Sequence, residues 1–312
     1  MGLGVDAFHT TVVVTTKMAD CLTIKGVNKP VVLHSLRTLA RFVRFVGRID
    51  VEVLEQVPSH IGLASNAMLS LAVAVGFNES LGRPLTNRTL RRFLGYNYVE
   101  EYEPPGAEFP EGRVIYGMNV GTSHAAGMYG GLVLLTSDVE IVSYQRPLPT
   151  EKVLICIPRM RPKKAISDEP EIERLLTTVR SLDSWQAQGR IYKVFMDLIP
   201  AIRKRDFAKI GEIYDDLLLQ GHQLSLFRNV YRYDLLPILG MFREESANVC
   251  GISSGGPTIF ATGSAEALGR IRTRLQDSLP DAEVMITDFS SGLTVTIGGS
   301  ERKYCLQPLE AE

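Results

Sequence analysis

The segment at residues 57–75 constrains the fold of this chain more than any other part of the sequence. The alternating apolar and polar residues 49–56 before it predict a half-buried strand. A proline and a glycine-containing turn then lead into a run rich in alanine and leucine, which favours a helix. Gly62 lets backbone N–H groups approach a ligand, and Ser65 and Asn66 can cap the helix. The turn is therefore either an anion site at a helix N-terminus or an ordinary capped helix after a tight turn.

Two further turns combine glycine with hydroxyl side chains. Residues 251–258 run into a strand predicted at 259–262, and residues 121–127 precede a strand predicted at 130–136. Glycine permits positive φ angles in such turns, and serine and threonine hydroxyls can donate hydrogen bonds to a ligand. Each turn on its own could equally be structural, as a hairpin or a bulge. The two turns supply our predicted substrate-binding residues, Gly121, Thr122, Ser123, Ser253, Ser254, Gly255, Gly256 and Thr258.

Helix and strand patterns are mixed along the rest of the chain, which predicts the α+β class. Further strands are predicted at residues 10–16, 31–33, 153–157, 284–287 and 293–297. Helices are predicted at residues 35–47, 66–76, 87–95, 171–199, 207–219 and 265–278. Prolines at positions 147 and 149 interrupt this order and suggest a division into two lobes, residues 1–150 and 151–312.

Arginine recurs at helical spacing in and just after the helix predicted at residues 35–47. Arg37, Arg41, Arg44 and Arg48 are separated by four, three and four residues, so they would share one helix face. Such a face is either solvated or in contact with a phosphorylated ligand.

The composition excludes several classes of protein. The 312 residues are 45% hydrophobic and 22% charged, so the chain can bury a core and is not disordered as a whole. A net charge of −1 argues against a protein that mainly coats nucleic acid or anionic lipid. The four cysteines are far apart and show no zinc-ligand spacing. Neither a secretory signal pattern nor a membrane span is visible, so we expect a cytoplasmic protein without nucleic-acid or membrane partners.

Taken together, the motifs resemble those of the GHMP superfamily, which includes galactokinase, homoserine kinase and mevalonate kinase. Residues 58–67 are similar to its phosphate-binding signature, Pro-x-x-x-Gly-Leu-Gly/Ala-Ser-Ser-Ala, and residues 251–258 to its late glycine-rich motif. Residues 58–63 and 253–258 further resemble the branch of β-ribofuranosylaminobenzene 5′-phosphate synthases, archaeal-type enzymes of methanopterin biosynthesis. The resemblance implies a GHMP-kinase-type fold with an N-terminal mixed α/β lobe and a C-terminal ferredoxin-like lobe. It assigns phosphate binding to Ser59, His60, Gly62, Leu63, Ala64, Ser65 and Asn66.

The sequence departs from the family pattern in three places. Residues 1–5 resemble the remainder of the family's opening turn, with the first strand missing. Position 66 is asparagine, where the kinases prefer serine and the synthase branch often has glycine. Residues 121–127 lack the aspartate that several of the kinases use as a base, which weakens the kinase interpretation.

The first functional hypothesis that the resemblance implies is a phosphoribosyltransferase. Such an enzyme condenses phosphoribosyl pyrophosphate with 4-aminobenzoate, or a similar aromatic acid, and releases CO₂ and pyrophosphate. The charge of the leaving pyrophosphate needs stabilisation, which suits the turn at residues 58–66 together with Mg²⁺. Because the arene ring itself can hold the developing charge, we expect no organic cofactor. The sequence assigns no ligands to the metal.

Two residues are candidates for the catalytic chemistry. Arg161 lies in a basic run at residues 159–164 and could clamp the carboxylate of the acid substrate. His124 could act as a general acid or base near neutral pH. The alternatives are a solvated basic loop and a structural histidine.

Two other functions stay open at this point. An ATP-dependent small-molecule kinase would hold the ATP phosphates on residues 62–66. A non-catalytic member of the fold would bind a metabolite or a partner without turnover. All three bind a small phosphorylated molecule or a related metabolite. Members of the superfamily are often dimers, so a homodimer is a further expectation.

Overall fold

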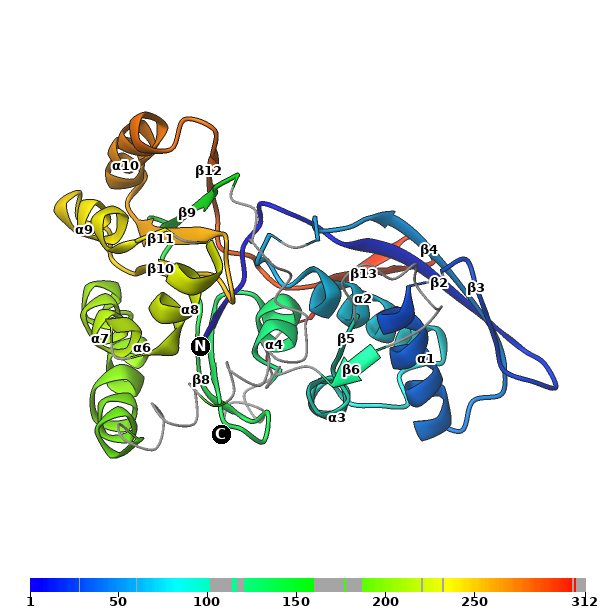
Figure 1. Cartoon of the computed structure of the whole chain (residues 1–312). Coiled ribbons are helices and arrows are strands. Elements are labelled where there is room, and N and C mark those ends of the chain that lie inside the picture. The colour runs from blue at the N-terminus through cyan, green and yellow to red at the C-terminus, as the bar shows by residue number, and fades with distance from the viewer. Residues whose placement is uncertain are drawn as a thin grey trace.

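The computed structural model describes residues 1–101, 114–116, 121–159, 177, 187–304 and 306, apart from residues 28, 60, 220 and 232. Helices and strands are mixed throughout this part of the chain, which confirms the predicted α+β class. Figure 1 shows two groups of elements side by side, with the blue and cyan segments in one group and the yellow and orange segments in the other.

A three-stranded sheet and three helices form the N-terminal group. The sheet has the order β2 (Thr11–Met18), β4 (Gly47–Glu55) and β3 (Thr23–Lys25), with β2 antiparallel and β3 parallel to β4. The helices are α1 (Pro30–Phe42), α2 (Ser65–Ser80) and α3 (Asn87–Tyr96). The alternation predicted at the start of β4 is present, since Ile49 and Val51 are buried and Glu52 is exposed. Helix α2 packs against β2 and α1, and the core of this group fills the space between them.

A second antiparallel sheet joins the first residues of the chain to its middle. Its order is β1 (Gly2–Leu3), β7 (Leu132–Leu135) and β8 (Ile141–Gln145). Helix α4 (Thr122–Tyr129) comes directly before β7 and packs against β1. Strands β5 (Val99–Glu101) and β6 (Val114–Tyr116) form a separate antiparallel pair.

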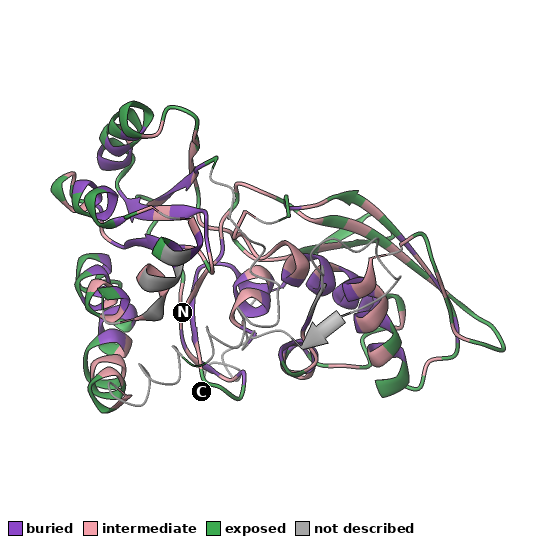
Figure 2. Ribbon diagram, viewed as in Figure 1, coloured by how far each residue is buried: buried purple, intermediate pink, exposed green. Residues whose placement is uncertain are grey.

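A four-stranded antiparallel sheet forms the C-terminal group. Its order is β10 (Cys250–Ile252), β11 (Ile259–Gly263), β9 (Lys152–Ile157) and β12 (Glu283–Thr287). This order places the second, third, first and fourth strands side by side, which is the ferredoxin-like arrangement that the resemblance implied. The helices of the group are η1, a π-helix (Lys193–Leu198), α6 (Ile199–Lys204), α7 (Phe207–Leu219), α8 (His222–Tyr231), α9 (Leu236–Glu244) and α10 (Ala265–Ser278). Figure 2 shows β11 buried and the outer faces of α9 and α10 exposed.

The hydrophobic cores cross the predicted lobe boundary at residue 150. Leu132 of β7 packs in one cluster with Ile202 of α6. The hairpin of β13 (Thr294–Ile297) and β14 (Ser300–Lys303) precedes Tyr304, which is buried in the core of the N-terminal group. The last part of the chain therefore completes the first core, and the division at this boundary stays a prediction.

Helix α1 begins and ends earlier than predicted. Pro30 occupies its first turn, where no backbone N–H is needed, so residues 31–33 are helical and the strand predicted there is wrong. The helix ends before Arg44, which has a φ of 55° in the turn into β4. Arg48 lies in β4 and forms an ion pair with Asp50 at 2.7 Å. The four arginines therefore do not share one helix face.

The other predicted helices agree with the structure to different degrees. Helices α7 and α10 have the predicted bounds. Helix α2 is longer than predicted, since it continues through Gly76 to Ser80. Glycine at position 76 allows the helix to pack closely on β2, because a Cβ atom there would lie 2.7 Å from Val14 Cγ2. Of the helix predicted at residues 171–199, only residues 177 and 187–199 lie in the described part, and these are helical. No helix among the described residues combines the length and the apolarity that crossing a membrane requires.

Candidate functional site

The three glycine-containing turns meet at one cavity of about 1020 Å³. The turn before α2, the first turn of α4 and the turn between β10 and β11 each form part of its wall. Of the predicted site residues, Gly62, Leu63, Ala64, Thr122, Ser123, Ser253, Ser254 and Thr258 line the cavity. The fold thus brings together residues that lie far apart in the sequence.

Helix α2 begins at the cavity without a side-chain cap. Its N-cap residue is Ala64, which has a φ of 57°, and Ser65 is the first residue of the helix. The prediction that Ser65 or Asn66 caps the helix is therefore wrong, because no side chain of the described residues hydrogen-bonds to the first-turn N–H groups. These donors, together with the positive end of the helix dipole, are left to bind an anion.

The turn between β10 and β11 packs directly against the turn before α2. Gly62 has a φ of 81°, and a Cβ atom on it would lie 2.7 Å from the backbone oxygen of Gly256. Ser253 Oγ donates a hydrogen bond to the Gly62 carbonyl at 2.8 Å, and Thr258 Oγ1 donates one to the Ile61 carbonyl. These two hydroxyl hydrogens already have backbone acceptors, so they shape the turn before α2. Ser254 lines the cavity at a φ of 55°.

Helix α4 has the same kind of N-terminus as α2. Its N-cap residue is Gly121, with a φ of 81° and no side-chain cap. The segment predicted as a glycine-rich turn is thus mainly helical, and its first two residues, Thr122 and Ser123, line the cavity. Two helix N-termini without side-chain caps therefore border one cavity, which suits a ligand with more than one phosphate group.

His124 lies beneath the cavity and has no exposed surface. Its Nε2 atom is 3.1 Å from Ser70 Oγ, and that hydroxyl donates its own hydrogen to the Ala67 carbonyl at 3.0 Å. Nε2 is therefore the donor, and the hydrogen bond connects α4 with α2. Burial lowers the pKa of His124 to about 4, so the imidazole is neutral at neutral pH. Since the ring cannot reach a substrate from this position, we reassign His124 from acid–base chemistry to holding the two helices together.

The remaining predicted site residues do not line the cavity or lie outside the described part of the chain. His60 and Arg161 lie outside the described residues. Six residues lie within two positions of a lining residue but are not themselves part of the wall: Ser59, Ser65, Asn66, Gly121, Gly255 and Gly256. Their assigned roles stay predictions.

Several lining residues carry no sequence signal that could have identified them. Residues 1–6 and 8–11 line the cavity because β1 pairs with β7 and Val5 bridges to Phe289. The rings of Phe8, Tyr98, Tyr214 and Phe260 also contribute to the wall. Only the tertiary pairing of strands brings these segments to the glycine-rich turns.

The charge of the cavity wall is negative in the part that the structure describes. Asp6 and Glu55 are exposed lining residues, and no described lining residue is lysine or arginine. An anionic ligand would therefore be held here mainly by N–H and O–H donors. Within the same described residues, no group of three or more histidine, cysteine, aspartate or glutamate side chains is arranged to hold a metal ion.

Comparison with known sequences finds two kinds of enzyme. The chain is 24% identical over 240 residues to homoserine kinase from Chlorobium phaeobacteroides strain BS1, a match that covers 75% of this chain and 65% of the kinase. It is 23% identical over 279 residues to β-ribofuranosylphenol 5′-phosphate synthase from Archaeoglobus fulgidus, covering 89% of this chain and 83% of the synthase. No family model matches the chain.

Solved structures show the same architecture. Homoserine kinase from Cytophaga hutchinsonii superposes with a TM-score of 0.63 at 18% identity, covering 92% of this chain and 88% of that one. Mevalonate pyrophosphate decarboxylase from Streptococcus pyogenes superposes with a TM-score of 0.62 at 13% identity, covering 92% and 86%.

The chain thus has a GHMP-type fold, with two helix N-termini at one cavity. The sequence relatives and the glycine-rich motifs agree with this class. The chain is therefore similar in fold and in sequence motifs to enzymes of the GHMP superfamily, in agreement with the resemblance. Enzymes of this superfamily, among them kinases and a synthase, are the proteins that it resembles.

Proposed function

We propose that this chain is a phosphoribosyltransferase that joins phosphoribosyl pyrophosphate to an aromatic acid and releases CO₂ and pyrophosphate. The observation that carries the proposal is the pair of N-termini without side-chain caps, on α2 and α4, at one cavity. Their N–H groups suit the pyrophosphate group, whose negative charge rises as it leaves. The hydroxyls of Thr122 and Ser123 add donors at the start of α4.

The aromatic part of the wall suits an arene as the acceptor. Phe8, Tyr98 and Phe260 give the cavity flat apolar surfaces on which a benzoate ring can pack. Tyr214 is also part of the wall, and burial raises its pKa to about 12, so its hydroxyl stays protonated as a donor. The synthase relative is named for a ribosylated phenol. For this chain, 4-hydroxybenzoate therefore joins 4-aminobenzoate as a candidate substrate.

The bonds that change in the proposed reaction balance without a redox partner. The bond from the anomeric carbon to pyrophosphate breaks, and its electron pair leaves with pyrophosphate. The ring carbon that bears the carboxylate bonds to the anomeric carbon. The bond to the carboxylate then breaks, CO₂ leaves, and the electron pair restores the aromatic ring. No organic cofactor is needed for these steps.

Mg²⁺ is part of the proposal as the counter-ion of the pyrophosphate group. Magnesium in such sites takes few protein ligands besides substrate phosphates and water. The hydroxyls at the start of α4 and the carboxylates of Asp6 and Glu55 are oxygen ligands of the required kind in the wall. When bound, the ion would neutralise negative charge on the leaving group.

An ATP-dependent small-molecule kinase is the second candidate. The match to homoserine kinase over 75% of the chain favours it. The same two helix N-termini would then hold the phosphates of ATP, and positioning of the acceptor would supply most of the rate.

A comparison of two assays separates the candidates. The chain is incubated with Mg²⁺, phosphoribosyl pyrophosphate and carboxyl-labelled 4-hydroxybenzoate or 4-aminobenzoate, and release of labelled CO₂ is measured. A parallel assay measures ADP formation from ATP with homoserine and other small alcohols. We expect CO₂ release that depends on both substrates. ADP formation without CO₂ release would establish the kinase, and turnover in neither assay would favour a non-catalytic member of the superfamily.

A further inference from the structure

A groove of about 740 Å³ between α1 and α3 is separate from the cavity. Among the described residues, none lines both. The groove combines two kinds of side chain, three arginines and three aromatic rings: Arg41, Arg88, Arg92, Phe42, Phe93 and Tyr96. Nothing in the proposed reaction uses them.

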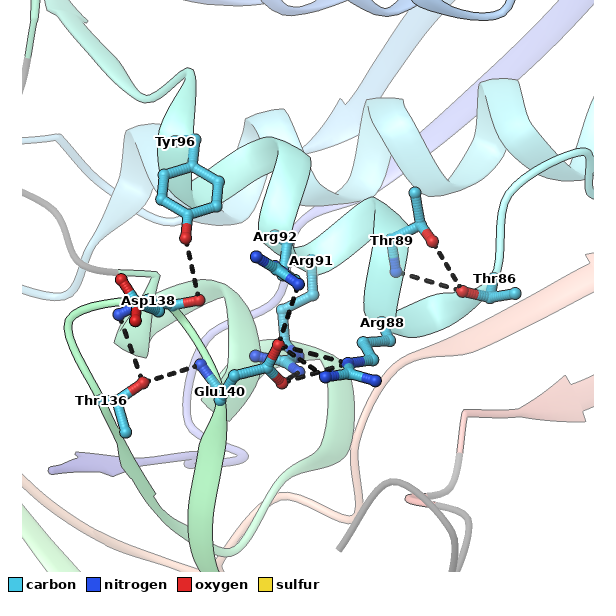
Figure 3. A network of polar contacts seen from close by, with 9 residues as sticks. All are labelled: Thr86, Arg88, Thr89, Arg91, Arg92, Tyr96, Thr136, Asp138 and Glu140. Carbon is cyan, nitrogen blue, oxygen red and sulfur yellow. Dashed lines mark hydrogen bonds and ion pairs between the residues drawn. The ribbon is translucent and has the colours of Figure 1, made fainter. Parts of the chain in front are cut away.

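One carboxylate holds the arginines of α3 in place. Arg88 Nη2 donates to Glu140 Oε1 at 2.9 Å, and Arg92 Nη1 lies 3.1 Å from the same oxygen (Figure 3). The buried Arg91 approaches the other oxygen of Glu140 at 3.7 Å. Hydrogen bonds from Arg88 hold the pKa of Glu140 below its usual value, so this carboxylate is ionised. The network fixes the guanidinium groups before any ligand arrives, which reduces the entropy lost on binding.

The positive charge in and behind the groove exceeds the negative charge that the structure places beside it. Arg41 lies on the α1 wall and is exposed, and its guanidinium has no hydrogen bond or ion pair with another described residue. Glu140 and Asp138 are the carboxylates beside the α3 arginines (Figure 3). Four guanidinium groups thus face two carboxylates. Guanidinium groups bind phosphate oxygens through paired N–H donors, so this excess suits a phosphate.

Two of the three aromatic rings are more exposed than large apolar side chains usually are. Phe42 is 55% exposed and Tyr96 is 52% exposed. Each ring is held in position: Phe42 packs on Phe93 with 5.3 Å between ring centroids, and the guanidinium of Arg92 lies 5.7 Å from the Tyr96 ring centroid. Rings fixed in this way offer a surface on which another planar ring can stack.

We propose that the groove between α1 and α3 is a second binding site, specific for a small aromatic compound that carries a phosphate group, such as a nucleoside monophosphate. The phosphate lies between Arg41 on one wall and Arg88 and Arg92 on the other, and the ring packs on Phe42 and Tyr96. The volume of the groove is in the range of sites for small molecules. The net charge of −1 of the whole chain favours a small ligand over a nucleic acid.

Calorimetric titration with AMP, UMP and phenyl phosphate tests the site on the full chain. Arg41→Gln removes a charge that no described residue pairs with, and Arg37→Gln is the matched control, an exposed arginine on the same helix outside the groove. We expect at least one of the three compounds to bind, with a Kd that rises tenfold or more in Arg41→Gln and changes less than twofold in Arg37→Gln. Adenosine and ribose 5-phosphate, which each lack half of AMP, should bind at least tenfold more weakly.

Three results would overturn the proposal. The first is that none of the three compounds binds. The second is equal affinity in the wild type and Arg41→Gln, with displacement by phosphoribosyl pyrophosphate, which would place the ligand in the cavity. The third is a dimer in sedimentation velocity that dissociates in Arg41→Gln, which would make the groove an interface between copies of the chain.

Discussion

Single glycines decide how closely the turns around the cavity approach one another. Gly62 has a φ of 81°, and a Cβ atom there would come within 2.7 Å of a backbone oxygen of the neighbouring turn. Gly82 has a φ of 74°, but nothing lies within 4 Å of a Cβ atom at that position. Both glycines have a left-handed backbone, but only at Gly62 would a Cβ atom clash with the neighbouring turn. Substitutions at the two positions therefore separate the strain of the backbone angle from the effect of the clash.

We expect Gly62→Ala to weaken pyrophosphate binding at least tenfold and Gly82→Ala to leave it unchanged. Both variants should lose about 1–2 kcal/mol in the free energy of unfolding, because alanine is disfavoured in the left-handed region, and Gly62→Ala should lose more because its Cβ meets the backbone oxygen of Gly256. Calorimetric titration with pyrophosphate and Mg²⁺ measures the first effect, and urea unfolding measures the second. Equal affinity in the two variants would mean that the turn before α2 is not the anion site.

The buried His124 should make stability depend on pH. Its pKa is about 4 in the folded chain and 6.5 without burial, so the unfolded state binds more protons between these values. The free energy of unfolding should therefore be highest above pH 6.5 and fall, by up to roughly 3 kcal/mol from this group, as the pH drops to 4. Urea unfolding across this range should show a smaller slope in His124→Asn. The exposed His9→Asn is the control, and equal slopes in wild type and His124→Asn would contradict the assignment.

At the scale of elements, a buried carboxylate fastens the C-terminal hairpin to α2. Glu79 lies near the end of α2, and its side chain is 4% exposed. It accepts hydrogen bonds from the Arg302 guanidinium and the Tyr304 hydroxyl, and Arg83 lies 3.5 Å away. A buried carboxylate is costly unless it is paired in this way, so the partners depend on one another.

Glu79→Gln tests this attachment while preserving the shape of the side chain. We expect the free energy of unfolding to fall by about 1–3 kcal/mol, because charge-assisted hydrogen bonds are lost and the Arg302 guanidinium loses its carboxylate partner. The control is Glu301→Gln, an exposed carboxylate on the same hairpin. If urea unfolding gives the same value for both variants, the hairpin is held by apolar packing alone.

The sequence predicted elements best where local signals and packing agree. Helix α10 has a Ser264 cap whose side chain accepts a hydrogen bond from Ala267 N, and its predicted bounds are confirmed. The capping of α2 was predicted wrongly because Ala64 is the N-cap residue and has a left-handed conformation, which alanine rarely adopts. The start of α1 was missed because two valines at the first turn favour a strand locally, whereas both are buried in the helical core.

At the scale of the whole molecule, the motifs predicted the fold class and the three turns that border the cavity, whereas the rest of the cavity wall depended on strand pairing. The three glycine-containing turns were identifiable because each one breaks a regular pattern. The first eleven residues were not, since their place follows from pairing between β1 and β7. The burial of His124 could not be predicted either, because no pattern in the glycine-rich motif distinguishes a buried histidine from an exposed one.

The return of the hairpin to the N-terminal core predicts that the two halves of the chain are not independent. A chain that ends at residue 292 lacks Val295 and Tyr304, which pack in that core. We expect it to lose on the order of 5 kcal/mol relative to a chain that ends at residue 306, from the apolar burial of the lost side chains and their contacts. Urea unfolding of both chains measures the difference. A truncated chain as stable as the longer one would show that the first core is complete without the hairpin.

The hydrogen bonds that shape the turn before α2 join residues 191 and 197 positions apart in the sequence. A chain emerging from a ribosome cannot form them until most of its sequence has been translated. The turn that we propose as the anion site therefore reaches its final shape late in synthesis, after the helix that it precedes has been made. If this turn binds the phosphate groups of the ligand, a nascent or prematurely terminated chain has no affinity for phosphorylated metabolites until its synthesis has passed the second turn.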